Sequence, residues 1–316
     1  MDMAYLRAHP EHLPTFLTHQ RIRETPVHRG VCTASRLTLD DGTSLFAKTW
    51  PAGEPPAGLL GEPPAGLLGE PPAGLLGEPP AGLFAAEAEG LRWLRASGAV
   101  PVPEILVTLP RMIAMEWVEP GDAGRQAAED FGRGLAALHR SGAESFGAPW
   151  PGWIGPLPLD NTPCPGPWST WFAERRLLPY LRISADQGTL SGADTALVEE
   201  VVKTIDRYAA EEPPARLHGD LWPGNVLWGA DGRAWLIDPA AHGGHRETDL
   251  ATLALFGGVP HLDVILDAYR AEWPLAAGWR SRVPLHQLHL LLVHTAAFGA
   301  GYRGAVVAAA EAVLRG

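Results

Sequence analysis

The chain has 316 residues, a length typical of two domains or lobes, and its 46% hydrophobic residues can supply substantial cores. Its formal net charge of -11 argues against non-specific binding to nucleic acid or to an anionic membrane, so any bound phosphate must be held by local donors. No apolar run approaches the roughly 20 residues of a membrane span, and the start lacks a secretory signal, so we expect a cytoplasmic protein.

The first fifty residues predict one helix followed by three strands. We expect the helix from about residue 10 to 23 and the strands at 27–32, 35–39 and 45–50, with a hairpin turn at Asp40–Gly42. Gly30 lies where the first strand turns, and backbone N–H groups there would cover the phosphates of a nucleotide. An ordinary turn glycine is the alternative.

A buried ion pair is predicted between the third strand and the next helix. Residues 84–94 have apolar side chains at helical spacing, and Glu87 lies on the same side as Leu91 and Leu94. An inward carboxylate needs a cation, and Lys48 is the candidate, although lysines on edge strands are usually solvated.

Between these elements, residues 53–84 repeat Gly-Glu-Pro-Pro-Ala-Gly-Leu four times. Paired prolines disfavour both a helix and a strand ladder, so we expect a flexible Gly/Pro insertion at the surface. Tandem expansion of one loop unit is the favoured interpretation, and a proline-rich docking site is the alternative.

A break in the chain at 119–122 separates two predicted lobes. Strands are expected at 104–108 and 112–117, and mostly helices follow. We therefore predict an α+β fold with a nucleotide-binding lobe at 1–118 and a catalytic and substrate lobe at 119–316, with the ligand in the cleft between them. In the second lobe, helices are expected at 131–139, 168–181 and 193–208, with His139 packed inward and an ordered loop at 146–168.

The strongest motif runs from His218 to Asp238. Short apolar runs at 226–228 and 235–237 flank an Asp231-Gly232 turn, which predicts a hairpin. Asn225 and Asp238 then meet at its open end, with Asp220 just before it. Oxygen ligands of this kind suit Mg²⁺, and a neighbouring carboxylate is able to take a proton from a hydroxyl nucleophile.

The spacing from Asp220 to Asn225 matches the kinase catalytic loop H-R-D-x-x-x-x-N, with Gly219 in place of the arginine. A surface hairpin with polar residues at its mouth is the alternative. Three residue types and two spacings coincide, which favours the kinase interpretation.

Together these motifs resemble the fructosamine kinase (ketoamine kinase) family, relatives of aminoglycoside phosphotransferases and of protein kinases. The resemblance rests on His218–Asn225, Ile237–Ala240, Gly244–Ala251 and Leu255–Gly258, with weaker matches at Phe84–Leu91, Leu135–His139, Phe146–Gly147 and Trp171–Leu177.

The resemblance implies a protein-kinase-like two-lobe fold and ATP-dependent phosphorylation of the sugar 3-hydroxyl of ketoamines, which repairs glycation. Asp220 would be the catalytic base, and Asn225 and Asp238 the Mg²⁺ ligands. Lys48 paired with Glu87 would hold the ATP phosphates, and the backbone of Glu116 to Val118 would meet adenine. The residues implied at the ketoamine are His245, Glu247 and His294. Trp222 lies two residues after the base, where its ring would stack on the sugar, and a Trp packed under the loop is the alternative.

Three rival functions remain. Only ten residues separate Asp238 from Asp249, which leaves no room for the long activation segment of a protein kinase. An aminoglycoside-type antibiotic phosphotransferase is the main alternative, although its polycationic substrate needs many carboxylates where this loop offers Trp222 and Trp228. A nucleotide-binding protein without catalysis is disfavoured by the intact motif residues.

Cys32 raises the possibility of redox control. It follows Gly30 in the expected phosphate-covering loop, where Arg29 would lower the thiol pKa and favour a reactive thiolate. A disulfide between two copies of the chain would then form a redox-linked dimer. A small apolar filler in a strand is the alternative.

Overall fold

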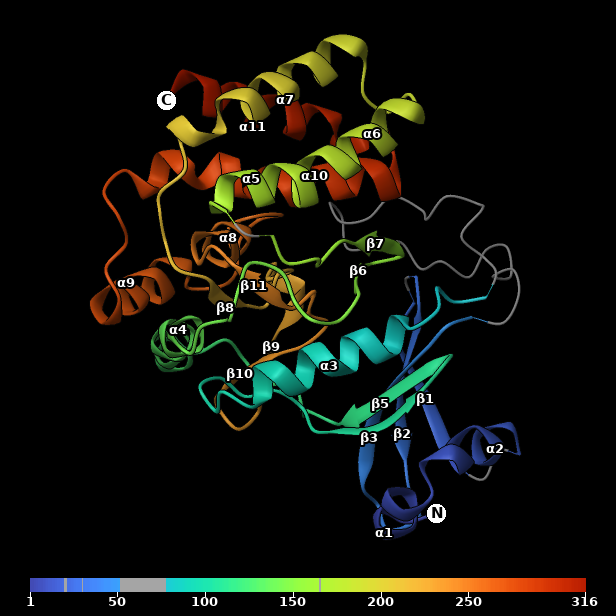
Figure 1. Ribbon diagram of the computed structural model, residues 1–316. Helices are drawn as coiled ribbons and strands as arrows, with labels where there is room; N and C mark the ends of the chain where they lie inside the picture. Colours follow the sequence, from blue (N-terminus) through green and yellow to red (C-terminus); the bar gives the residue numbers. More distant parts are fainter. Residues whose placement is uncertain (20–21, 30, 52–77, 165) are drawn as a thin grey trace.

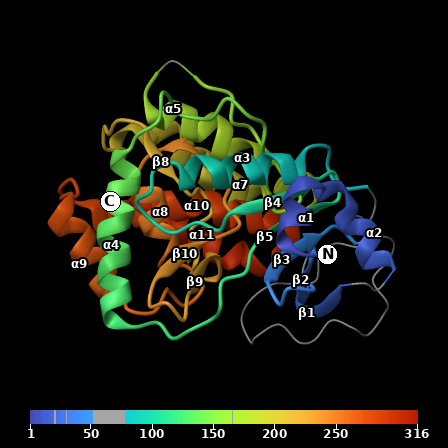
Figure 2. The same ribbon diagram turned by 90° about the horizontal axis from the view of Figure 1, so that it is seen from below.

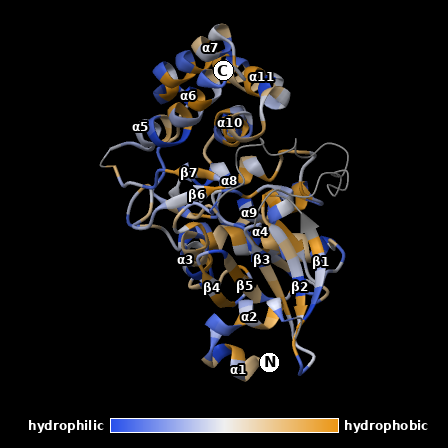
Figure 3. Ribbon diagram, turned by 90° about the vertical axis from the view of Figure 1, so that its right-hand side faces the viewer, coloured by the Kyte–Doolittle hydropathy of each residue, from blue (hydrophilic) through white to orange (hydrophobic). Residues whose placement is uncertain are grey.

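The computed structural model describes residues 1–19, 22–29, 31–51, 78–164 and 166–316. Gly30 and most of the insertion 53–84 lie outside the described residues. A sheet with one long helix forms one end of the molecule, and helices form most of the rest (Figure 1). Helix α1 (Met3–Ala8) lies at the opposite end from α7 (Gly192–Thr204) and α11 (Arg303–Arg315) (Figure 3). The α+β class is confirmed, and the boundary at residue 118 stays a prediction.

Five antiparallel strands form the N-terminal sheet in the order β1-β2-β3-β5-β4. Side chains alternate between the two faces of a strand, and in β3 Leu45 and Ala47 are buried on the face opposite Lys48. The sheet therefore directs Lys48 toward the helical part. The strands are β1 (Arg23–Arg29), β2 (Thr33–Thr38), β3 (Ser44–Thr49), β4 (Ile105–Leu109) and β5 (Met112–Glu116).

Helix α3 (Leu83–Arg95) packs beside this sheet and faces Lys48. Phe84, Leu91 and Leu94 recur at helical spacing and are buried, and Glu87 lies on the same buried side. The helix begins after Gly82, whose φ of +83° suits glycine and few other residues. Glu87 is thereby delivered to the interior of the molecule, as the spacing predicted.

Helices pack around short hairpins in the C-terminal part. Helices α4 (Arg125–Arg140) and α9 (Leu262–Glu272) lie side by side (Figure 2). A long helical stretch joins α5 (Trp168–Phe172), a π-helical turn (Ala173–Leu177) and α6 (Leu178–Asp186). The other elements of this part are α8 (Glu247–Thr252), α10 (Trp279–Phe298), and the strand pairs β8 (Ala215–Leu217) with β11 (His242–Gly244) and β9 (Val226–Trp228) with β10 (Ala234–Leu236).

Two predicted segments differ from the structure. The expected helix at 10–23 is a 3₁₀ turn (Pro10–His12) followed by α2 (Leu13–Thr18), and β1 already begins at Arg23. The expected loop at 146–168 contains a hairpin of β6 (Gly152–Ile154) and β7 (Leu157–Leu159). Gly155, with a φ of +53°, makes its tight turn, and strands of three residues are too short for a periodic pattern to reveal.

The helical part buries an unusual set of histidines. Burial lowers the pKa of His289 to about 3 and that of His294 to about 4. It also lowers the pKa of four other histidines: His218, His242, His245 and His286. Each ring is therefore held neutral in the folded chain.

We predict that the free energy of unfolding falls as the pH falls below about 6.5, the ordinary histidine pKa. The unfolded chain then binds protons that the folded chain refuses, and each such histidine costs up to about 1.4 kcal/mol per pH unit. Glu87 and Asp220, whose pKa burial raises to about 7, act in the opposite direction but are fewer. Urea unfolding at pH 7.5, 6.5 and 5.5 measures this, and a constant or rising stability would contradict it.

Candidate active site

The hairpin β9–β10 brings Asn225 and Asp238 together. Val226 pairs with Leu236, and just beyond this pair the amide of Ile237 donates to the carbonyl of Asn225 at 3.2 Å. The side-chain amide of Asn225 then donates to the carbonyl of Asp238 at 3.2 Å. Both residues therefore lie at the open end of the hairpin, where the sequence predicted them.

Asp220 lies against the same end. Asn225 Nδ2 donates to the Asp220 carbonyl at 2.8 Å and to its carboxylate at 3.2 Å. Burial raises the pKa of Asp220 to about 7, and the charge of Asp238 adds to the effect. A carboxylate with raised proton affinity is well suited to accept a proton from a hydroxyl.

Asp249 in α8 holds the loop that carries Asp220. Its fully buried carboxylate accepts the backbone amides of His218 at 2.7 Å and Gly219 at 2.9 Å. His139 Nε2 lies 3.2 Å from the same carboxylate, so Nε2 carries a proton, and its Nδ1 lies 2.8 Å from the Tyr269 hydroxyl. The structural role predicted for His139 is confirmed.

Gly219 is required by the path of this loop. Its φ is +80°, and an added Cβ would lie 2.2 Å from the Ala240 carbonyl oxygen. The side chain of His218 contacts the carbonyl of Ile237 at 2.8 Å, which ties the loop to the hairpin. An arginine, as in the kinase motif, would not fit at position 219.

Lys48 joins the sheet to the helix and the hairpin. Its Nζ lies 3.0 Å from Glu87 Oε2 and 2.7 Å from Asp238 Oδ1, so the contact predicted between Lys48 and Glu87 is present. Burial opposes the charge of Lys48, but the two carboxylates outweigh it and raise its pKa. Burial likewise opposes ionisation of Asp238, yet Lys48 lowers the pKa of that carboxyl.

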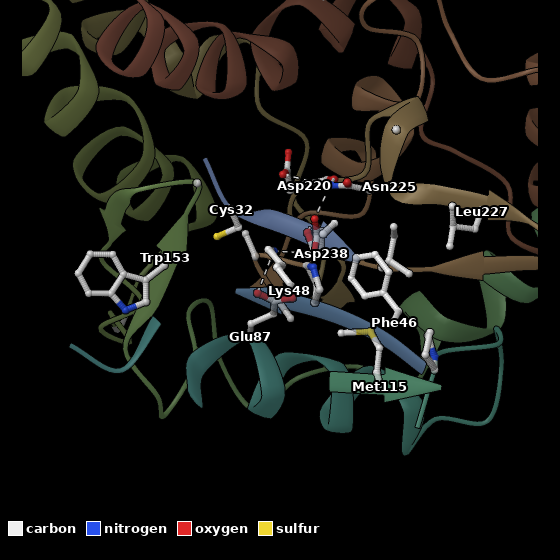
Figure 4. A pocket seen from close by; sticks show the side chains of 18 of the residues that line it. Cys32, Phe46, Lys48, Glu87, Met115, Trp153, Asp220, Asn225, Leu227 and Asp238 are labelled. Atoms are coloured by element: carbon white, nitrogen blue, oxygen red, sulfur yellow. Dashed lines mark hydrogen bonds and ion pairs between the residues drawn. The ribbon is translucent and has the colours of Figure 1, made fainter. Parts of the chain in front are cut away.

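A cavity of about 780 Å³ opens beside these groups, with walls from both parts of the chain. Figure 4 shows Phe46, Met115 and Leu227 on one side of it and Trp153 on the other, with Lys48 and Asp238 between them. The side formed by Phe46, Met115 and Leu227 is apolar, and the charged groups lie next to it.

The connection after β5 also borders the cavity. Glu116 and Val118 both line it. The amide of Glu116, however, donates to the Glu104 carbonyl at 2.8 Å, so this N–H is not free to bind adenine. Of the predicted stretch, the backbone beyond Glu116 is the better candidate.

Trp222 lines the cavity and also packs on its own loop. Its ring meets Phe256 at a centroid distance of 6.1 Å and covers Gly224, where an added Cβ would lie 2.1 Å from the indole. His294 contacts Phe256 at 4.7 Å but does not line the cavity. The structure thus places His294 against Phe256, and its predicted contact with a substrate stays a prediction.

His245 and Glu247 are not at the cavity, contrary to the prediction. Both are buried, and Glu247 forms a two-point ion pair with Arg282 at 2.6 and 2.8 Å. His245 contacts the carbonyl of Ala210 at 3.2 Å. Both oxygens of Glu247 are taken by Arg282, so this carboxylate stabilises the core and has no oxygen left for a substrate.

The prediction for Cys32 is also wrong in its chemistry. The thiol is half-buried in the cavity wall, and burial raises its pKa to about 12. A raised pKa disfavours the thiolate, which is the reactive form. A redox-linked dimer through Cys32 is therefore not supported.

Among the residues that the structure describes, no helix is long and apolar enough to cross a membrane. The sequence model of a family described as fructosamine kinase matches residues 79–316. Proteins named probable ketoamine kinase are similar as well. One from Thermus thermophilus is 38% identical over 220 residues, which cover 70% of this chain and 78% of that protein. One from Enterococcus faecium is 34% identical over 222 residues, covering 68% and 77%.

Comparison with solved structures points to the same family. A candidate fructosamine-3-kinase from Thermobifida fusca has 50% identity and a TM-score of 0.81, with 93% of each chain covered. The aminoglycoside phosphotransferase APH(4)-Ia has a TM-score of 0.61 and 14% identity, covering 95% of this chain and 98% of that one, which shows a shared kinase-like fold alone. With most of its length matched by the family and by named relatives, the chain belongs to the fructosamine kinase family.

Proposed function

We propose that this chain is an ATP-dependent kinase that phosphorylates the sugar 3-hydroxyl of ketoamines and thereby promotes deglycation. The observation that carries the proposal is the meeting of Asp220, Asn225, Asp238 and Lys48 at one cavity in a chain of this family. Its relatives are named for ketoamine and fructosamine substrates.

The proposed nucleotide site uses the apolar side of the cavity. Phe46 and Met115 from the sheet and Leu227 from β9 would enclose adenine, and the backbone beyond Glu116 would meet its edge. Lys48 would bind the phosphates, because it is a partly buried cation in the cavity wall that Glu87 holds in place. Gly30 stays a prediction.

Asn225 and Asp238 fit Mg²⁺. Asn225 turns its Nδ2 toward Asp220 and the Asp238 carbonyl, which leaves Oδ1 as its acceptor atom, and the carboxylate of Asp238 is ionised because its pKa is lowered. Such hard oxygen atoms are the preferred ligands of this ion. When bound, Mg²⁺ neutralises phosphate charge, while Asp220 orients the acceptor hydroxyl and takes its proton.

The acceptor would lie against Trp222, whose ring lines the cavity two residues after Asp220. The acidic side chains among the described lining residues are Glu87, Glu116, Asp220 and Asp238. Three of them belong to the ion-pair and catalytic cluster, so few carboxylates remain for a polycation. This distribution favours a sugar over an aminoglycoside.

The substrate assignment is tested by a phosphorylation panel. We predict phosphate transfer from ATP to ribulose-, erythrulose- or fructose-lysine, measured by mass spectrometry, and little transfer to kanamycin. Preferential phosphorylation of kanamycin would reverse the assignment, and ATP turnover without any dependence on an acceptor would refute both.

Asp220→Asn is predicted to lower kcat by about 10² to 10⁴, the usual contribution of a positioned base. The amide keeps the size and the acceptor oxygen of the side chain, so folding and ATP binding should hardly change. Asp231→Asn, at the opposite end of the same hairpin, is the matched control and should keep normal turnover. Near-normal kcat in Asp220→Asn would remove Asp220 from this role.

Asp238→Ala is predicted to abolish the Mg²⁺-dependent part of ATP binding, because it removes a charged ligand. Calorimetric titration with ATP, with and without Mg²⁺, measures this part directly. The variant should show the same affinity under both conditions, whereas the parent should bind more tightly with the metal. A parent-like gain with Mg²⁺ in the variant would place the metal elsewhere.

A further inference from the structure

One end of the cavity is formed by the hairpin β6–β7 and the segment after it. Trp153 and Asn161 line this end, and Figure 4 shows Trp153 on the far side of Lys48 from Phe46. With adenine at Phe46, this end is the one left for the phosphate acceptor. The following inference therefore rests on the proposed function.

The side chain of Asn161 is fixed in one orientation. It is 3% exposed, and Arg176 Nη2 lies 2.7 Å from its Oδ1. A guanidinium only donates hydrogen bonds, so the atom that faces it must be the oxygen. The amide Nδ2 consequently points the other way, next to Gly152 in the cavity wall, where an added Cβ would lie 2.6 Å from it.

A buried charged side chain, Arg176, holds Asn161 in this orientation. Arg176 is fully buried, stacks on Trp171 at 4.2 Å and donates to the Asp160 carbonyl at 2.7 Å, while the Asp160 carboxylate pairs with Arg175. A buried guanidinium is costly unless it is hydrogen-bonded, and here the Asp160 carbonyl and Asn161 Oδ1 accept from it. Arg176 also sits in the π-helical turn Ala173–Leu177, a distortion found frequently at functional sites.

Two donors near this end have no partner. Within the described part of the chain, neither Asn161 Nδ2 nor Trp153 Nε1 finds a hydrogen-bond acceptor, although both atoms are buried. An unpaired buried donor destabilises a fold and is rarely kept without a reason. Both belong to residues that line the same end of one cavity. Because neither atom has accessible surface in this structure, a ligand reaches them only when a side chain of the cavity wall turns aside.

We propose that Asn161 and Trp153 bind oxygen atoms of the acceptor, with Arg176 as the residue that positions Asn161. N–H donors match hydroxyl, carbonyl and ring oxygens, and they repel an ammonium group. The polyhydroxylated sugar therefore faces the β6–β7 hairpin. The amine substituent of the ketoamine points away from it.

The test is calorimetric binding of fructose-lysine to the full chain with Mg²⁺ and a non-hydrolysable ATP analogue. Asn161→Leu removes the amide at nearly constant size, and Trp153→Phe removes the indole N–H while keeping a ring. Each is expected to weaken ketoamine binding about 3- to 10-fold, the cost of one neutral hydrogen bond. Binding of the nucleotide analogue should stay within about two-fold of the parent by the same measure.

Thr108→Val is the matched control. Its hydroxyl is also a buried group without a partner in the described residues, but β4 places it outside the cavity wall, so ketoamine binding should not change. Arg176→Met should reproduce the loss seen in Asn161→Leu. If Asn161→Leu does not fold, Trp153→Phe still decides.

Unchanged ketoamine affinity in the folded variants would overturn the inference, as would equal losses of ketoamine and nucleotide affinity. Failure of the parent to bind any ketoamine would overturn both this inference and the proposed function. Binding by the parent without phosphate transfer would overturn the proposed reaction alone.

Discussion

The carboxylate of Asp249 is the anchor on which the candidate site depends. Two successive amides, those of His218 and Gly219, donate to it, and His139 supplies a third donor. A buried carboxylate is tolerated only when it is satisfied in this way. Because the amides belong to the loop that carries Asp220, the same bonds that satisfy Asp249 also fix the position of the proposed base.

A second constraint is the concentration of negative charge around one lysine. Glu87 and Asp238 both contact Lys48, from residues 39 and 190 positions away in the sequence. Glu87 is buried and would be costly to keep there without a cation, so Lys48 links the sheet to α3 as well as to the hairpin. Burial raises the pKa of Glu87, whereas Lys48 lowers the pKa of Asp238, whose Oδ1 lies closer to Nζ, at 2.7 Å against 3.0 Å.

The sequence predicted the features of the site that are set by residues close together in the chain. The hairpin β9–β10 was predictable because its turn and both strands are contiguous, and its geometry then placed Asn225 near Asp238. Charge and burial predicted the contact of Lys48 with Glu87. The anchoring role of Asp249 was missed, because only the fold brings α8 behind the loop. The helix has the sequence ETDLAT, in which polar residues surround Asp249, so no local pattern marked this carboxylate as buried.

The errors have the same origin. His245 and Glu247 lie in a motif but face inward, and sequence alone does not show that Arg282 meets Glu247. The pKa of Cys32 was misjudged because exposure, and not only the nearest cation, sets the charge of a thiol.

Helix α3 is attached to the catalytic part by close packing. An added Cβ at Gly90 would lie 3.1 Å from Ala241 Cβ, and Arg216 stacks on Trp93 at 4.6 Å and donates to its carbonyl. These contacts hold Glu87 relative to Asp238 before any ligand arrives, so the charges are preorganised and little reorganisation is left for the reaction.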